Sequence, residues 1–274
     1  MCELICGSEG TLAFITEIKL NLVNCPPKNK VVVAAHFQTL QEALEATVIV
    51  AMKFQPNCEI IDKVVLDCTK ANKTYSKNRA FIEGDPAAIL CVEFSYDDLK
   101  DCLQKAKQLQ MTLENEDLGY HFPYLQADDI NKLWSLRKAG LGLLANIPGD
   151  SKAIANVEDT AVRIEDLPNY IADFKAMMDS YNQACVYYAH AGAGELHLRP
   201  ILNLKDKKDR ADFRNIALDT AKLVKKYGGS LSGEHGDGIV RGEFLPLMIG
   251  EKNYQLKALK FSFDEHNITI KGKL

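Results

Sequence analysis

The sequence predicts an α+β fold in which a mainly antiparallel sheet carries helices on one face. Two observations support this prediction. Short apolar runs typical of strands alternate with longer stretches whose apolar residues repeat near 3.6. These strand–helix–strand units occur in two successive cycles, and a length of 274 residues allows one large domain or two small ones.

An alternating segment near the start predicts the first strand. Ile18, Leu20 and Leu22 point to one side and polar residues to the other, which is typical of a half-buried strand over 16–22. Residues 25–29, which contain two prolines, then break the pattern as a linker would. Because no earlier strand precedes this one, we expect it to be the last strand of a domain that lies mostly upstream.

The two cycles follow the linker. Thr39 and Glu42 form a capping box that predicts the start of the first long helix. The first cycle has strands over 30–38, 58–66 and 88–94 and helices over 39–54 and 97–110. The second has helices over 126–144, 164–181 and 207–226, strands over 154–157, 184–189 and 196–200, and a loop over 227–242.

Composition excludes several classes of protein. The chain has 47% hydrophobic residues and a net charge of −4, so it can bury a core and does not have the basic surface of a nucleic-acid binder. Its apolar runs are too short for a membrane span, and its start does not resemble a signal peptide. The cysteines stand singly, which predicts reduced thiols in a cytoplasmic protein and no iron–sulfur site within the chain.

Two histidines separated by glycines form the first candidate site. His190 and His197 stand seven apart around an Ala-Gly-Ala-Gly-Glu segment. This odd spacing would place them on opposite faces of a continuous strand, but the glycines permit a bend that brings both imidazoles together. Two imidazoles are half of a site for Zn, Mn or Fe(II). The alternative is two separately packed polar residues.

A glycine-rich segment over 228–242 adds a carboxylate and an imidazole. Adjacent residues in extended chain diverge, so Glu234 and His235 need different partners. We expect Glu234 to complete the metal ligands with His190 and His197, and His235 to stand beside the metal as a general base. The alternative is a turn whose Glu and His are simply solvated.

Two basic residues are candidates for binding a substrate carboxylate. Arg137 lies on the predicted helix beside the single tryptophan, and its planar guanidinium suits a carboxylate. Lys152 follows a Pro-Gly turn and could add a second positive contact. The alternatives are a salt-bridged helix arginine and a surface lysine. Glu158 and Asp159 are interpreted as the beginning of the next helix.

These motifs resemble one enzyme family. Residues 7–13 resemble the end of the flavin-binding domain in FAD-linked oxidases of the vanillyl-alcohol-oxidase type. The rest resembles the C-terminal substrate domain of the branch that contains D-lactate dehydrogenase, glycolate oxidase and D-2-hydroxyglutarate dehydrogenase. The resemblance rests on His190-(x6)-His197 and Gly-Glu234-His235-Gly, supported by Trp-Ser-Leu-Arg137. It implies a ferredoxin-like sheet over 25–274, preceded by the end of an FAD-binding domain over 1–24.

The resemblance also assigns roles. It implies that His190, His197 and Glu234 bind a divalent metal, that His235 is the catalytic base, and that Arg137 and Lys152 bind substrate. The glycine turn would contact the flavin through Gly7, Ser8, Glu9, Gly10 and Thr11.

Two departures point to a longer parent protein. The segment between the histidines is unlike the Gly-Asp-Gly-Asn of simple dehydrogenases and looks like that of large forms with an added iron–sulfur module. The closing segment from residue 263 does not have the prolines typical of the family. We therefore expect a fragment that neither retains FAD nor turns over by itself, with any cluster in a module beyond it.

The resulting prediction is the catalytic half of a flavin-dependent dehydrogenase that oxidises a small D-2-hydroxy acid to the 2-oxo acid. The expected location is the cytoplasm, with attachment to the inner membrane left open for the parent and a homodimer considered. The alternatives are a non-catalytic metal-binding module and a flavoprotein of the same family with another substrate, such as an ether-lipid precursor. The sequence does not identify the electron acceptor.

Overall fold

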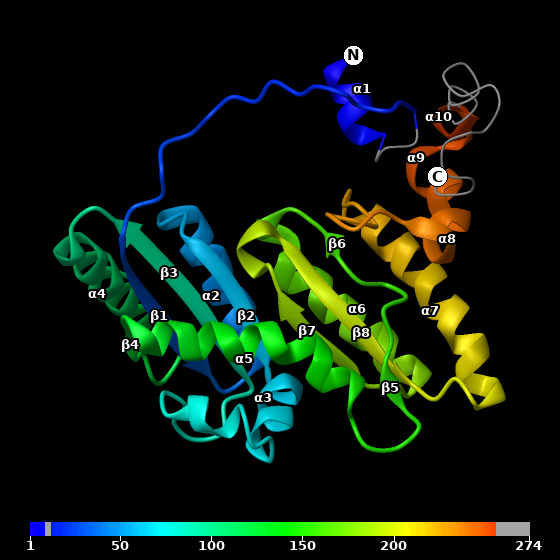
Figure 1. The fold of residues 1–274 in the computed structure, drawn as a ribbon. Coiled ribbons are helices and arrows are strands. Elements are labelled where there is room, and N and C mark those ends of the chain that lie inside the picture. Colours follow the sequence, from blue (N-terminus) through cyan, green and yellow to red (C-terminus); the bar gives the residue numbers. More distant parts are fainter. Residues whose placement is uncertain (9–11, 256–274) are drawn as a thin grey trace. The chain divides into compact units, whose positions relative to one another are not determined.

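The computed structural model describes residues 1–8 and 12–255. They fall into two compact units, one over residues 26–234 and the other over residues 1–25 together with those from 235 onward. The larger unit contains the sheet shown in Figure 1. The described helices of the smaller unit are α1 (Cys2–Gly7), α8 (Gly238–Arg241), α9 (Leu245–Ile249) and α10 (Glu251–Tyr254).

The sheet of the larger unit has the strand order β4-β1-β3-β2-β7-β8-β5, with β6 paired to β8. Every pairing is antiparallel, as predicted. The strands are β1 (Asn29–Phe37), β2 (Asn57–Asp62), β3 (Ala88–Tyr96), β4 (Tyr124–Leu125), β5 (Lys152–Ala153), β6 (Thr160–Ala161), β7 (Cys185–Ala189) and β8 (Glu195–Leu202). The β4-β1-β3-β2 part has the expected ferredoxin-like strand order, with a further helix inserted between β2 and β3.

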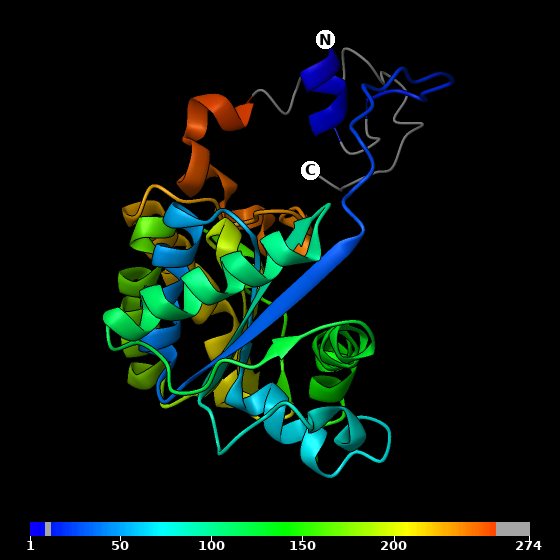
Figure 2. The same ribbon diagram turned by 90° about the vertical axis from the view of Figure 1, so that its left-hand side faces the viewer.

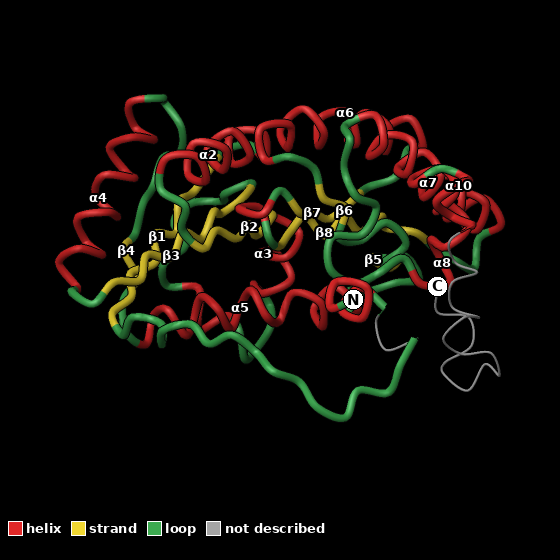
Figure 3. Tube along the Cα trace, turned by 90° about the horizontal axis from the view of Figure 1, so that it is seen from above, coloured by secondary structure: helices red, strands yellow, loops and turns green. Residues whose placement is uncertain are grey.

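Helices cover the two faces of the sheet unequally. Helices α2 (Leu40–Lys53), α4 (Leu99–Asn115), α6 (Leu167–Tyr181) and α7 (Lys207–Lys226) lie along one face, as Figure 3 shows from above. Helices α3 (Lys63–Lys70) and α5 (Asp128–Ala145) lie on the other, and Figure 2 shows this second layer beside β1. The prediction placed helices on one face only.

Strand β1 carries the signal for this second layer. Val31 and Val33 point to one face and Val32 and Ala34 to the other, yet all four side chains are fully buried. A strand covered on both faces has a continuous apolar run, whereas a half-exposed strand alternates. The unbroken run therefore reflects helices on both sides of the sheet.

The local signals place most elements correctly. Thr39 caps α2 by accepting a hydrogen bond from the Glu42 amide at 3.1 Å. The predicted strand over 58–66 is too long, because Asp62 caps α3 by accepting from the Val65 amide at 3.0 Å. The predicted strand over 154–157 is wrong, since these residues join β5 to β6.

The predicted strand over 16–22 is also wrong. Residues 13–27 form no helix or strand. Ile18, Leu20 and Leu22 have exposed fractions of 64%, 78% and 93%. A strand needs a partner for its backbone N–H and C=O groups, and within the described residues no strand pairs with this segment.

Candidate metal centre

The candidate centre lies on one face of the neighbouring strands β2, β7 and β8. Tyr188 and His197 are directly opposite in the β7–β8 pairing. The β2–β7 register, continued by one residue, places Glu59 opposite His190, and the Glu195 amide donates to the His190 carbonyl at 3.4 Å. Because opposite residues of an antiparallel pair share a face, these side chains gather on the same side of the sheet.

A tight turn brings the two histidines together. The 3₁₀ turn Ala191–Ala193 and Gly194, with φ of +72°, join β7 to β8. A Cβ on Gly194 would lie 2.2 Å from the Val162 carbonyl oxygen, so only glycine fits there. The rings of His190 and His197 consequently meet edge to face, with centroids 5.3 Å apart.

Asp159 holds the segment that carries Glu234. Its carboxylate accepts hydrogen bonds from the Ser232 hydroxyl at 2.7 Å and from the Glu234 amide at 3.1 Å. Its carbonyl accepts from the Gly233 amide at 2.7 Å. Asp159 is fully buried and does not begin the next helix, which starts at Leu167. The interpretation of this acidic pair as a helix start is therefore wrong.

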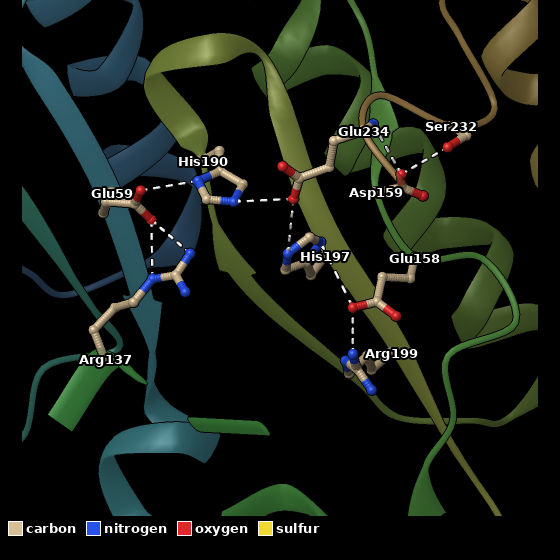
Figure 4. Close-up of polar contacts among 9 residues, drawn as sticks. All are labelled: Glu59, Arg137, Glu158, Asp159, His190, His197, Arg199, Ser232 and Glu234. Atoms are coloured by element: carbon tan, nitrogen blue, oxygen red, sulfur yellow. Dashed lines mark hydrogen bonds and ion pairs between the residues drawn. The ribbon is translucent and has the colours of Figure 1, made fainter. Parts of the chain in front are cut away.

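The atoms that face one another are suitable metal ligands. Oε1 of Glu234 lies 3.2 Å from Nε2 of His190 and 3.7 Å from Nε2 of His197 (Figure 4). One ligand atom from each of these three residues and from Glu195 lies within 4.8 Å of the others. Ligand atoms around one tetrahedral zinc ion are about 3.4 Å apart. The donor types and spacing therefore fit a divalent cation.

The centre is buried at one side and accessible at the other. His197 and Glu195 are 6% and 7% exposed. The side chains of His190 and Glu234, in contrast, are 32% and 44% exposed. A cation bound here would be reached by solvent from the side of His190 and Glu234.

Glu59 connects His190 to Arg137. Its Oε1 lies 2.9 Å from Nδ1 of His190, and its Oε2 accepts from Nε and Nη2 of Arg137 at 3.0 and 2.8 Å. Hydrogen bonding of Nδ1 to a carboxylate fixes the tautomer and leaves Nε2 as the ligand atom. That nitrogen is the one that faces Glu234.

A second carboxylate–arginine pair lies beside His197. Arg199, two residues further along β8, is buried and pairs with Glu158, whose Oε1 is 3.8 Å from Nδ1 of His197. The guanidinium groups of Arg199 and Arg137 lie 5.8 and 6.0 Å from the centroid of the Tyr188 ring. Burial raises the pKa of Tyr188 and Arg199 opposes this shift, so the phenol stays neutral at physiological pH.

The structure does not bring Lys152 to this cluster. Lys152 lies opposite Leu202 in the β5–β8 pairing and donates to the Ile147 carbonyl. Leu202 is five residues from His197, which is about 17 Å along a strand. Because this separation is odd, Leu202 and its partner Lys152 point to the opposite face of the sheet from His197.

The remaining predicted site residues belong to the smaller unit. His235 is exposed, follows Glu234 directly in the chain, and begins the second segment of that unit. Gly7 ends α1, and the hydroxyl of the buried Ser8 donates to the Ile5 carbonyl at 2.7 Å. Glu9, Gly10 and Thr11, like the closing segment from 263, lie outside the described residues.

Sequence reasoning missed four residues of the cluster: Glu59, Glu158, Glu195 and Arg199. Glu59 had a detectable signal, because it is a carboxylate within the otherwise apolar strand segment from Cys58 to Ile61. Glu195 and Arg199 lie two residues before and after His197 and so share its face.

Comparisons with known proteins identify the family of this chain. Residues 26–274 match the family described as FAD linked oxidases, C-terminal domain. The chain belongs to this family.

Curated relatives agree with the family assignment. D-2-hydroxyglutarate dehydrogenase of Pseudomonas putida is 35% identical over 281 residues, which cover 99% of this chain and 28% of the relative. The Escherichia coli protein of the same name is 30% identical, with 100% and 28% covered. D-lactate dehydrogenase [cytochrome], mitochondrial, of Arabidopsis thaliana is 26% identical, with 100% and 47% covered. The chain thus spans 28% of the length of the first two relatives.

Solved structures share the fold at low identity. 4-Ethylphenol oxidase from Gulosibacter chungangensis superposes with a TM-score of 0.61 at 13% identity, covering 90% of this chain and 54% of that chain. Alkyldihydroxyacetonephosphate synthase gives a TM-score of 0.58 at 15% identity, covering 97% and 48%. These likenesses show the fold.

None of the helices in residues 1–8 and 12–255 combines the length and apolar character that a membrane span needs.

Proposed function

We propose that this chain is the substrate and metal half of an FAD-dependent dehydrogenase that oxidises a small D-2-hydroxy acid to the 2-oxo acid. The observation that carries the proposal is the convergence of His190, His197 and Glu234 on one point. The relatives named D-2-hydroxyglutarate dehydrogenase and D-lactate dehydrogenase support the substrate class. In this proposal residues 1–24 belong to the flavin domain and 25–274 to the substrate domain.

The reaction removes a proton from the 2-hydroxyl and a hydride from Cα. A divalent cation held by the cluster would polarise the hydroxyl as a Lewis acid, and FAD would supply the two-electron acceptor. His235 would accept the hydroxyl proton on its imidazole, because it follows the ligand Glu234 directly in the chain. Its exposed ring can pass that proton to solvent.

Arg137 would bind the substrate carboxylate. Two of its N–H groups are held by Glu59, which fixes the plane of the guanidinium next to the cluster. A fixed planar fork suits a carboxylate and loses little conformational entropy when it binds one. The roles of Lys152 in substrate binding and of residues 7–11 at the flavin rest on the resemblance alone.

The test uses the FAD-containing enzyme of which, in this proposal, the chain is one half. His235→Ala should lower kcat for D-2-hydroxyglutarate or D-lactate with a dye acceptor by about 10²–10⁴-fold, as expected for loss of a general base. Bound metal, measured by elemental analysis, should not change. His121→Ala is the control, since His121 lies beside His36 and away from the cluster.

Each other outcome contradicts the proposal in a different way. Unchanged turnover in His235→Ala would show that His235 is not the general base of the reaction. If the wild-type protein reduces its flavin only with a substrate that is not a 2-hydroxy acid, the proposed substrate class is wrong and the chain belongs to another branch of the family.

A further inference from the structure

We propose that Glu195 is a fourth protein ligand of the metal, so that the centre is a two-histidine, two-glutamate site. The inference rests on the metal site of the proposed function and extends it to a residue with no assigned role there. It starts from position: Glu195 opens β8, is aligned with His190 across the β7–β8 hairpin, and shares a face with His197.

The segment that carries Glu234 packs directly against this carboxylate. A Cβ added to Gly233 would lie 2.5 Å from Oε2 and 2.8 Å from Cδ of Glu195. Only the missing side chain of Gly233 lets the two pieces of chain approach so closely. The contact places the carboxylate of Glu195 beside Gly233, the residue directly before Glu234.

Charge gives a second reason. Glu59 faces Arg137 and Glu158 faces Arg199, so each of these pairs is neutral. Glu195 and Glu234 add two further carboxylates beside the imidazoles of His190 and His197. Glu195 is 7% exposed, and carboxylates gathered away from water are stabilised by nearby positive charge. A divalent cation among these four residues supplies it.

Four protein ligands restrict which cation serves the proposed function. A tetrahedral zinc ion would be filled by them, as in structural zinc sites. An octahedral cation such as Mn²⁺ or Fe²⁺, which accepts carboxylate oxygens and imidazole, would keep two positions for a substrate. The site therefore favours an octahedral ion in the active enzyme.

The first test is titration of the chain with Mn²⁺ alone and with Zn²⁺ alone by calorimetry. Glu195→Gln keeps the shape of the side chain and removes its charge. It should weaken binding by at least about 100-fold, the upper end of the effect of outer-sphere partners. Glu165→Gln, at an exposed glutamate outside the cluster, is the matched control and should bind like the wild type.

A third variant separates this inference from the proposed function. If His197→Ala loses the metal and Glu195→Gln binds it with wild-type affinity, the fourth ligand is wrong and the three-ligand site stands. If the wild-type chain binds neither cation, both proposals fail.

A second measurement does not depend on the folding of a variant. A Mn²⁺- or Zn²⁺-loaded crystal of the wild-type chain should show an anomalous peak about 2.0–2.2 Å from a carboxylate oxygen of Glu195. A peak bound to His190, His197 and Glu234 but beyond ligand distance of Glu195 would overturn the inference.

Discussion

The larger unit contains two pairs of histidines with nearly the same geometry. The rings of His36 and His121 meet edge to face at 5.0 Å and 81°, and those of His190 and His197 at 5.3 Å and 81°. Both pairs involve residues at the sheet, the first at β1 and the second at the β7–β8 hairpin. What differs is the set of side chains around the rings.

The first pair lies in an aromatic cluster. His36 is fully buried, contacts the rings of Phe81 and Tyr120, and shares a hydrogen bond at 2.7 Å with the Ala34 carbonyl. Burial lowers the pKa of His36 to about 4. This pair serves packing.

The second pair is surrounded by carboxylates. Glu59, Glu195 and Glu234 approach its rings, and Glu158 lies beside His197. Two touching imidazoles are therefore insufficient to define a metal site. Several carboxylates converge on the second pair, whereas Glu83 approaches the first, and this convergence makes the second pair the candidate metal site.

The largest expected effect comes from removing a histidine of each pair. His197→Ala should weaken Mn²⁺ or Zn²⁺ binding by about 100- to 1,000-fold, because roughly 10–16 kcal/mol of zinc binding free energy is shared among about four ligands. His121→Ala should leave the affinity unchanged. Calorimetric titration measures both, and equal losses in the two variants would remove the distinction between the pairs.

The next largest effect is the loss of folding stability that His36 causes in acid. Because the pKa of His36 is about 4 in the folded chain against 6.5 in the unfolded chain, the unfolded state binds more protons between these values. Stability is thus lost as pH falls from 6.5 to 4, by about 3 kcal/mol from this group. His36→Asn cannot titrate, so its urea unfolding free energy should fall less than that of the wild type between pH 7 and 4.5. Equal pH dependence would contradict the assignment.

The smallest effect tests the carboxylates next to each pair. Glu59→Gln should weaken metal binding by about 10–100-fold, because the hydrogen bond that orients His190 loses its charge. Glu83→Gln is the counterpart, since Glu83 lies 3.7 Å from His121 and is mostly exposed. It should have no effect on calorimetric affinity. If Glu59→Gln also has none, Glu59 does not position His190.

Much of the fold was predictable because its signals are local. The periodicity that places α7 at 207–226 and the cap at Thr39 act within a few residues. The errors arose where a local pattern needs a distant partner or competes with a cap. The alternation over 16–22 forms no strand without a neighbour, and Asp62 ends β2 by capping α3.

The candidate site was predictable only in part for the same reason. Glycines marked the turn between His190 and His197 and the approach of Glu234. Glu59 and Glu195 reach the cluster through strand register, which no short motif encodes. The partner of Arg137 could not be inferred either, because Glu59 lies far from it in sequence.

The bonds from Asp159 to residues 232–234 have a topological consequence. These hydrogen bonds hold residues 232–234 near the β7–β8 hairpin. The stretch from His197 to Glu234 therefore begins and ends at the same place and contains all of α7. Both ends of that stretch are tied independently of the exposed turn at 204–206. A circular permutant opened at this turn would keep both anchor points, whereas one opened at 232 would release Glu234.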